Sequence, residues 1–96
     1  MIVHIVMFKF CDENKSENLL VVKSRLEELA SKIPMLEKME VGIDFNQSER
    51  AFDLSLYSTF ATKDDLKAYA VHPAHLEVLE LIKKVTEVSK VVDYEL

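Results

Sequence analysis

Tyr69-Ala-Val-His-Pro-Ala-His75 encodes a break between two helices. Proline disfavours helical geometry in the residue before it, so a helix that enters this stretch should end near Val71. Proline is also favoured at the first position of a helix, because an N–H at that position has no intrahelical partner in any case. A second helix should therefore begin at Pro73, with His72 near its N-cap and His75 in its first turn.

The composition describes one small globular domain, residues 1–96. Hydrophobic residues make up 49% and charged residues 30% of the chain, which is enough apolar material for a core of its own. The net charge of −5 argues against binding to nucleic acid or to an anionic membrane surface, because both reward lysine and arginine. No apolar run has the length of a membrane span, and the first residues show no signal-peptide pattern. The single cysteine, Cys11, cannot form an internal disulfide, so we expect a cytoplasmic protein.

The first half of the chain predicts a strand followed by a helix. The strand should cover residues 1–10, of which residues 2–8 are apolar on both faces of an extended chain, with His4 the one polar side chain on the even-numbered face, so this strand should lie in the middle of a sheet. Apolar residues then recur at helical spacing over 19–33, which predicts one amphipathic helix. Asn14 followed by Glu17 offers a capping pair for the start of this helix.

The second half predicts three more strands around the broken helix. Alternating side chains predict strands over 36–45 and 52–60, and a final strand over 90–96. Thr62, followed by Asp65, is a typical N-cap for the helix that leads into the His-Pro break. The order is therefore β-α-β-β-α-β, with the second helix broken.

This order is the ferredoxin-like α+β motif, an antiparallel four-stranded sheet with its helices on one face. The opposite face would present Val3, Ile5 and Met7 of the first strand, which is too apolar a row to face water comfortably. A second copy of the same sheet is the simplest cover. We therefore expect a homodimer that forms a dimeric α+β barrel.

Five segments spread along the whole chain form a recognisable pattern. They are His4-Ile-Val-Met-Phe-Lys-Phe10, Glu40-Val-Gly42, Ser58-Thr-Phe60, Ala68-Tyr-Ala-Val-His-Pro-Ala-His75 and Val91-Val-Asp-Tyr94. The pattern resembles the stress-responsive A/B barrel domain family, often called Dabb. The resemblance implies a dimeric α+β barrel with a binding or stress-protective role, and no cofactor or metal. It does not by itself imply one activity.

One class of members, plant polyketide cyclases, uses three positions that match His4, Tyr69 and His75. The resemblance therefore implies that these residues are catalytic in an alternative function: a cofactor-free enzyme acting on a small hydrophobic carbonyl or polyketide-like compound by cyclisation or proton abstraction. Those enzymes have a further histidine where this chain has Leu54.

The residues themselves are compatible with such chemistry. If the even-numbered face of the first strand meets the helices, His4, Tyr69 and His75 should line one internal cavity between the sheet and the helices. A neutral histidine beside a tyrosine hydroxyl can abstract an acidic proton and stabilise the enolate that forms. The helix N-terminus beside His75 should favour its neutral form.

Structural interpretations of the same residues remain open. His72 and His75 can cap helix N–H groups and bond to the backbone, which would fix the corner, and His4 can be a core histidine bonded to Tyr69. A zinc site from the three histidines is a weaker alternative, because the intervening proline is unusual in a zinc pair. Cys11 is a poor candidate nucleophile, since no histidine is near it in sequence.

Overall fold

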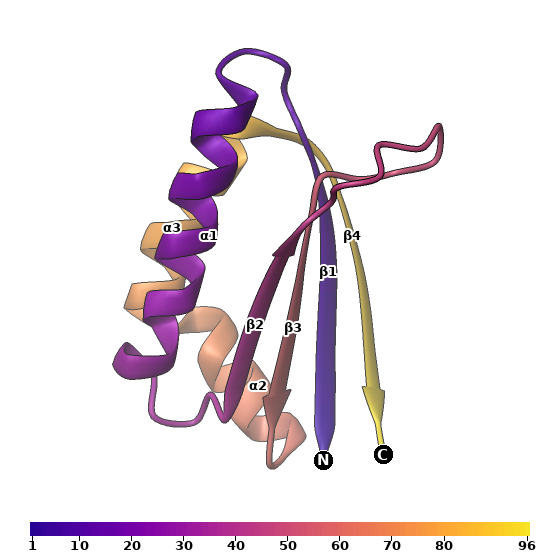
Figure 1. Cartoon of the computed structure of the whole chain (residues 1–96). Coiled ribbons are helices and arrows are strands. Elements are labelled where there is room, and N and C mark those ends of the chain that lie inside the picture. The colour runs from indigo at the N-terminus through magenta and orange to yellow at the C-terminus, as the bar shows by residue number, and fades with distance from the viewer.

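The computed structural model describes all residues, Met1–Leu96, and confirms the ferredoxin-like architecture. The elements are β1 (Ile2–Phe10), α1 (Lys15–Lys32), β2 (Lys38–Ile43), β3 (Leu54–Phe60), α2 (Lys63–Val71), α3 (Pro73–Val85) and β4 (Thr86–Glu95). The strands form one antiparallel sheet in the order β2-β3-β1-β4. The helices all cover one face of this sheet, and the other face carries none (Figure 1). None of the helices combines the length and apolar character that crossing a membrane requires.

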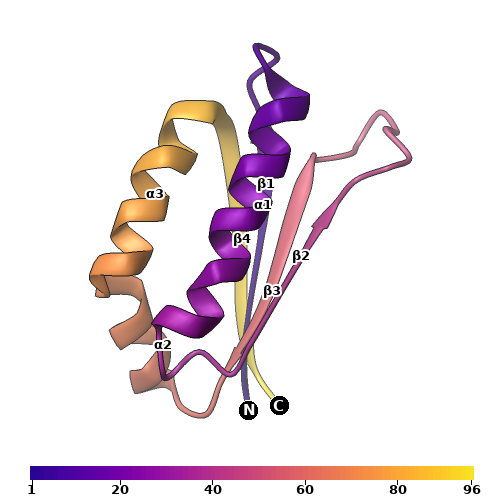
Figure 2. The same cartoon turned by 60° about the vertical axis from the view of Figure 1, so that its left-hand side comes forward.

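The core lies between the helices and the face of the sheet that they cover. β1 is central, between β3 and β4, as its two apolar faces predict. Its even-numbered side chains enter the core, where α1 and α3 meet them; Figure 2 shows these two helices side by side. The buried residues of these three elements are Ile2, Val6, Phe8, Phe10, Val22, Leu26, Leu29, Val78 and Ile82. Each fully buried aliphatic or aromatic side chain stabilises the fold by about 1.5–3 kcal/mol.

The break between α2 and α3 lies where the sequence predicts it. α2 ends at Val71 and α3 begins at Pro73, with His72 in extended geometry between them (φ −64°, ψ 135°). The backbone N–H of Ala74 donates to Nδ1 of His72 over 3.1 Å, so His72 is the N-cap of α3. The break turns the chain between Tyr69 and His75.

Of the N-caps predicted for the other two helices, one is confirmed and one is wrong. Thr62 caps α2 as predicted, because its hydroxyl oxygen accepts from the N–H of Asp65 over 3.1 Å. The predicted capping pair of Asn14 and Glu17 is wrong. Asn14 adopts left-handed geometry (φ 53°), which asparagine tolerates, and its side chain caps no N–H of α1.

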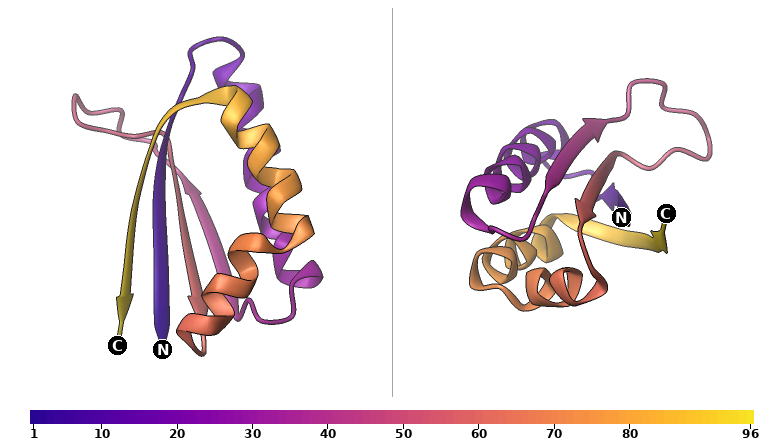
Figure 3. Two further views of the ribbon diagram at one scale, coloured as in Figure 1. Left: turned by 180° about the vertical axis from the view of Figure 1, so that it is seen from behind. Right: turned by 90° about the horizontal axis from the view of Figure 1, so that it is seen from below.

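Residues 44–53, which we call the arm, project beyond the sheet between β2 and β3 (Figures 1 and 3). The predicted strands over 36–45 and 52–60 are consequently shorter in the structure. The base of the arm is braced, since the N–H of Asp44 donates to the carbonyl of Asp53 over 2.9 Å. The Asp53 carboxylate in turn accepts from the N–H of Phe10 over 2.8 Å. The arm is therefore anchored to the end of β1.

The uncovered face of the sheet, which we call the helix-free face, is partly apolar. Side chains alternate along a strand, so the odd-numbered residues of β1 point to this face and cross-strand partners share it. Ile5 pairs with Val92 of β4 and with Tyr57 of β3, and Met7 pairs with Lys90 of β4. Met7 and Val92 are 44% and 53% exposed, whereas Val3 is fully buried within the chain, so the predicted apolar row of the first strand is exposed only in part.

Candidate functional site

Three rings meet on the helix-covered side of the sheet. His4 comes from β1, Tyr69 from the last turn of α2 and His75 from the first turn of α3. The ring centroid of Tyr69 lies 6.3 Å from that of His4 and 4.4 Å from that of His75. Phe60 packs against Tyr69 from β3, with their centroids 5.0 Å apart. We call His4, Tyr69 and His75 the ring cluster; its role in ligand binding or catalysis remains a prediction.

His4 is held by a carboxylate on the neighbouring strand. The register of β1 and β4 sets His4 opposite Asp93, and Nδ1 of His4 bonds Oδ1 of Asp93. An ionised carboxylate only accepts hydrogen bonds, so Nδ1 is the donor and Nε2 of the neutral ring keeps its lone pair. The sequence-based alternative in which His4 bonds Tyr69 is wrong, because the Tyr69 hydroxyl makes no hydrogen bond in the chain.

Tyr69 is buried and lacks a polar partner. The residue is 1% exposed, and its hydroxyl makes no hydrogen bond within the chain. Burial raises the pKa of Tyr69 to about 12, so the hydroxyl stays protonated at any physiological pH. A buried polar group without a partner costs about 1–3 kcal/mol and is rare in folded proteins. The Tyr69 hydroxyl is thus a hydrogen-bond donor that the fold leaves free.

His75 presents a lone pair beside this donor. Its Nδ1 lies 3.0 Å from the carbonyl oxygen of Ala70, and a carbonyl only accepts, so Nδ1 donates and Nε2 is unprotonated. Burial lowers the pKa of His75; the Ala70 contact opposes this, and the charges of His4 and His72 add to it. The neutral form is favoured, as the sequence predicts. Its main cause is burial rather than a helix N-terminus.

The remaining candidates stand apart from the ring cluster. His72 caps α3, as one of the structural interpretations proposes. The zinc alternative finds no ligand set, because no group of three or more His, Cys, Asp or Glu side chains is placed to hold a metal ion. Cys11 follows the far end of β1, where its N–H donates to the carbonyl of Val85 over 2.9 Å.

The ring cluster reaches solvent at β4, which is an edge strand. The side chain of His4 is 17% exposed and that of Asp93 is 46% exposed. Close by, Nζ of Lys63 on α2 lies 3.6 Å from Oε1 of Glu95 on β4. The predicted internal cavity is not confirmed, because hollows of about 360 Å³ and about 90 Å³ both lie elsewhere and neither is lined by the ring cluster.

The arrangement favours one type of ligand. Tyr69 offers a proton to an acceptor oxygen, while Nε2 of His4 and Nε2 of His75 each offer a lone pair. The surroundings are apolar, since Phe60 packs on the Tyr69 ring. A small, mostly apolar molecule with a carbonyl oxygen and a nearby acidic O–H or C–H would match these groups.

Asp93 is the residue of this site that sequence reasoning missed. The alternation over the final strand separates Asp93 from Val92 and Tyr94, but alternation does not give the register with β1. A shift of one residue would have placed Asp93 on the opposite face.

Comparison with known proteins identifies a family and a relative that this chain resembles. Residues 2–96 match the family described as Stress responsive A/B Barrel Domain. A stress-response A/B barrel domain-containing protein from Arabidopsis thaliana is 32% identical over 80 residues, which is 83% of this chain. The chain spans only 30% of the length of that relative.

Two solved structures share the fold over nearly the whole chain. A dimeric protein of unknown function and ferredoxin-like fold from Bacteroides fragilis is 37% identical with a TM-score of 0.83, covering 99% of this chain and 95% of that one. A dimeric ferredoxin-like protein from Thermobifida fusca is 25% identical with a TM-score of 0.89, covering 99% of this chain and 90% of that one. Both are described as dimers.

Proposed function

The chain belongs to the stress-responsive A/B barrel domain family, and from this premise we propose that it is a homodimer that binds a small molecule at Tyr69. The observation that carries the ligand site is the Tyr69 hydroxyl, which is buried and has no partner in the chain. A ligand acceptor oxygen would supply the missing hydrogen bond. A cytoplasmic location and a stress-protective role for this binding belong to the same proposal.

The homodimer is supported by the helix-free face. Met7, Val92 and Tyr94 are exposed there, at 44%, 53% and 40%. Two sheets packed face to face would bury these side chains between them. The Bacteroides fragilis protein, which is 37% identical to this chain, is described as a dimer. A two-fold contact between identical faces is the commonest way in which such a surface is covered.

The ligand we propose is a small aromatic or aliphatic ketone, or a related carbonyl compound. Its carbonyl oxygen would accept from Tyr69, and its hydrocarbon part would lie against Phe60. An ordinary hydrogen bond contributes about 0.5–1.5 kcal/mol, and here it would also relieve the cost of an unpartnered hydroxyl. The carbonyl should therefore add measurably to the affinity that the apolar part of the ligand provides.

Catalysis at the same place is a second proposal, and the contact between His4 and Asp93 favours it. Asp93 holds the ring so that Nε2 of His4 carries the lone pair. That nitrogen could take a proton from a carbon next to the ligand carbonyl, and the Tyr69 hydroxyl would stabilise the negative charge that develops on oxygen. Under this proposal His4, Tyr69 and His75 are the catalytic residues, with the neutral His75 as a second acceptor.

A thermal-shift screen tests ligand binding. Acetophenone and its ring-hydroxylated derivatives should raise the melting temperature of the wild type, and ethylbenzene, which has no oxygen, should not. Tyr69→Phe should reduce the shift at a given ketone concentration, whereas Tyr57→Phe, on the other face of the sheet, should retain it in full. If no ketone shifts the wild type, or if Tyr69→Phe shifts equally, the proposed site is wrong.

A further inference from the structure

Gly42 is the single glycine of the chain, and nothing within the chain requires a glycine there. It lies in β2, and its φ is not positive, so the backbone is one that any residue adopts. A Cβ added to it would meet only Oγ of Ser55, at 3.9 Å, which is an ordinary contact. Glycine inside a strand weakens the strand, and often marks a place where another molecule approaches closely.

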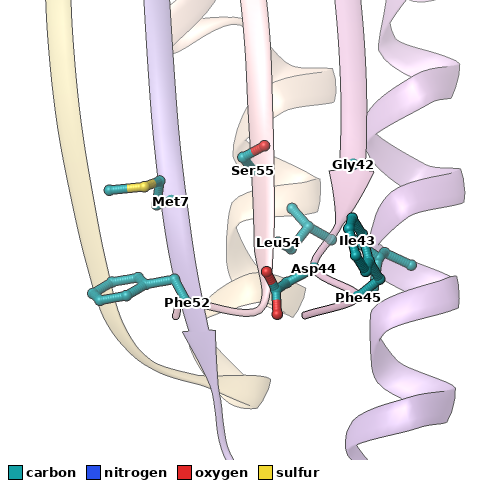
Figure 4. A pocket seen from close by; sticks show the side chains of 8 residues that line it. All are labelled: Met7, Gly42, Ile43, Asp44, Phe45, Phe52, Leu54 and Ser55. Carbon is teal, nitrogen blue, oxygen red and sulfur yellow. The ribbon is translucent and has the colours of Figure 1, made fainter. Parts of the chain in front are cut away.

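Gly42 lines a hollow that has a volume of about 360 Å³. Figure 4 shows Met7 and Phe52 on its β1 side and Phe45 on its β2 side. Phe45 is 94% exposed, and Met7 is 44% exposed. These apolar side chains form walls around a position without a side chain, so the hollow has the shape and chemistry to receive an apolar group from outside.

The hollow is continuous with the helix-free face. Met7 belongs to both, and its cross-strand partner Ser55 stands beside Gly42 in the register of β2 and β3. Phe45 and Phe52 extend this surface into the two ends of the arm, which is braced at its base by the bond between Asp44 and Asp53. An exposed phenylalanine on a braced segment is a feature typical of an interface rather than of a free surface.

We propose that this hollow receives an apolar side chain from the helix-free face of a second copy of the chain, with Gly42 as the open position that admits it. The inference rests on the proposed homodimer and specifies where the two copies interlock. Packed sheets lie about 10 Å apart and interdigitate their side chains, so a missing side chain on one sheet is filled by a protruding one on the other. The hollow shares the face on which Val92 and Tyr94 protrude.

Sedimentation equilibrium of wild type and Gly42→Leu tests this directly. The leucine fills the hollow, and the dissociation constant of the dimer should rise by at least about tenfold, the size of effect seen at interface positions that carry binding energy. The free monomer should stay folded, because Gly42 is exposed and a Cβ at this position meets only Oγ of Ser55, at 3.9 Å. Ala30→Leu places the same side chain at an exposed position of α1 and should leave the dissociation constant unchanged.

Phe45→Ser is the second variant, and it tests the contact between the two copies at the hollow if Gly42→Leu does not fold. It removes one wall of the hollow at a residue that is almost fully exposed in its own chain, so it should weaken the dimer several-fold without lowering monomer stability. If the wild type is a dimer and both variants dimerise equally well, the interlock is wrong while the homodimer stands. If the wild type is a monomer, the homodimer itself is wrong.

Discussion

Asp93, near the end of β4, holds the imidazole of His4 on β1 across 89 residues of sequence. The contact does two things. It joins the edge strand to the central strand on the side where the helices lie, and it sets the tautomer of His4 so that Nε2 carries the lone pair. The orientation of one ring of the cluster is thus fixed by the strand register and not by the residues next to it in sequence.

Asp93→Ala should remove the preference of His4 for the tautomer that is protonated on Nδ1. Nitrogen-detected NMR of the imidazole should show His4 protonated largely on Nδ1 in the wild type and on a mixture of both nitrogens in the variant. The loss of unfolding free energy should stay below about 1 kcal/mol, because the Asp93 side chain is 46% exposed and a surface pair contributes little. An unchanged nitrogen pattern would show that Asp93 does not set the tautomer.

Tyr69→Phe should not destabilise the protein. The hydroxyl that it removes has no partner, so the unfolding free energy should stay equal or rise by up to about 1 kcal/mol. Urea denaturation of both proteins measures the difference, with Tyr57→Phe as the control for loss of a half-buried hydroxyl. A loss of more than about 1 kcal/mol would indicate a hydrogen bond to Tyr69 through a bound water.

Tyr69 should also make the protein sensitive to alkali. Burial raises the pKa of Tyr69 to about 12, above the ordinary value of 10.0, so ionisation of its hydroxyl favours the unfolded state. The contribution of Tyr69 is complete below pH 10 and is lost as the pH rises toward 12, by on the order of 2 kcal/mol. Denaturation midpoints measured from pH 9 to 12 should fall less steeply for Tyr69→Phe than for the wild type. Parallel curves would contradict the burial of this hydroxyl.

Ile5→Lys should convert the dimer into a folded monomer. Ile5 is on the helix-free face, opposite Val92, and a lysine there would place a charge in the contact between two sheets. Sedimentation equilibrium at micromolar concentration should give twice the 11.1 kDa chain mass for the wild type and the chain mass for the variant. Ile5→Val is the matched control and should remain dimeric. If Ile5→Lys unfolds instead, Ile5 belongs to the core of the single chain.

The parts of the structure that sequence predicts well are those encoded locally. The helix break needs only His72 and Pro73, and the apolar stripes set the inner faces that carry Tyr69 and His75. The convergence of these two residues with His4 required one further assumption, which face of β1 meets the helices. Both faces of β1 are apolar, so the sequence did not decide between them, and the structure places the even-numbered side chains in the core.

The parts that sequence missed depend on non-local geometry. Asp93 belongs to the site through the β1–β4 register, which alternation alone leaves undetermined. Asn14 has the chemistry of an N-cap, but the chain enters α1 through left-handed geometry that its side chain cannot combine with capping. The hollow at Gly42 arises where the arm leaves the sheet, and the start and end of the arm were both predicted as strand.

The most direct test of the proposed site is a binding titration monitored by ¹⁵N–¹H NMR, using acetophenone with ethylbenzene as the matched control. We expect saturable shifts centred on residues 69–75 and on His4 for the ketone alone, and an affinity lower by about fivefold to tenfold in Tyr69→Phe, the equivalent of about 1 kcal/mol. Equal affinity of wild type and Tyr69→Phe, or shifts confined to the helix-free face, would contradict a ligand site at Tyr69.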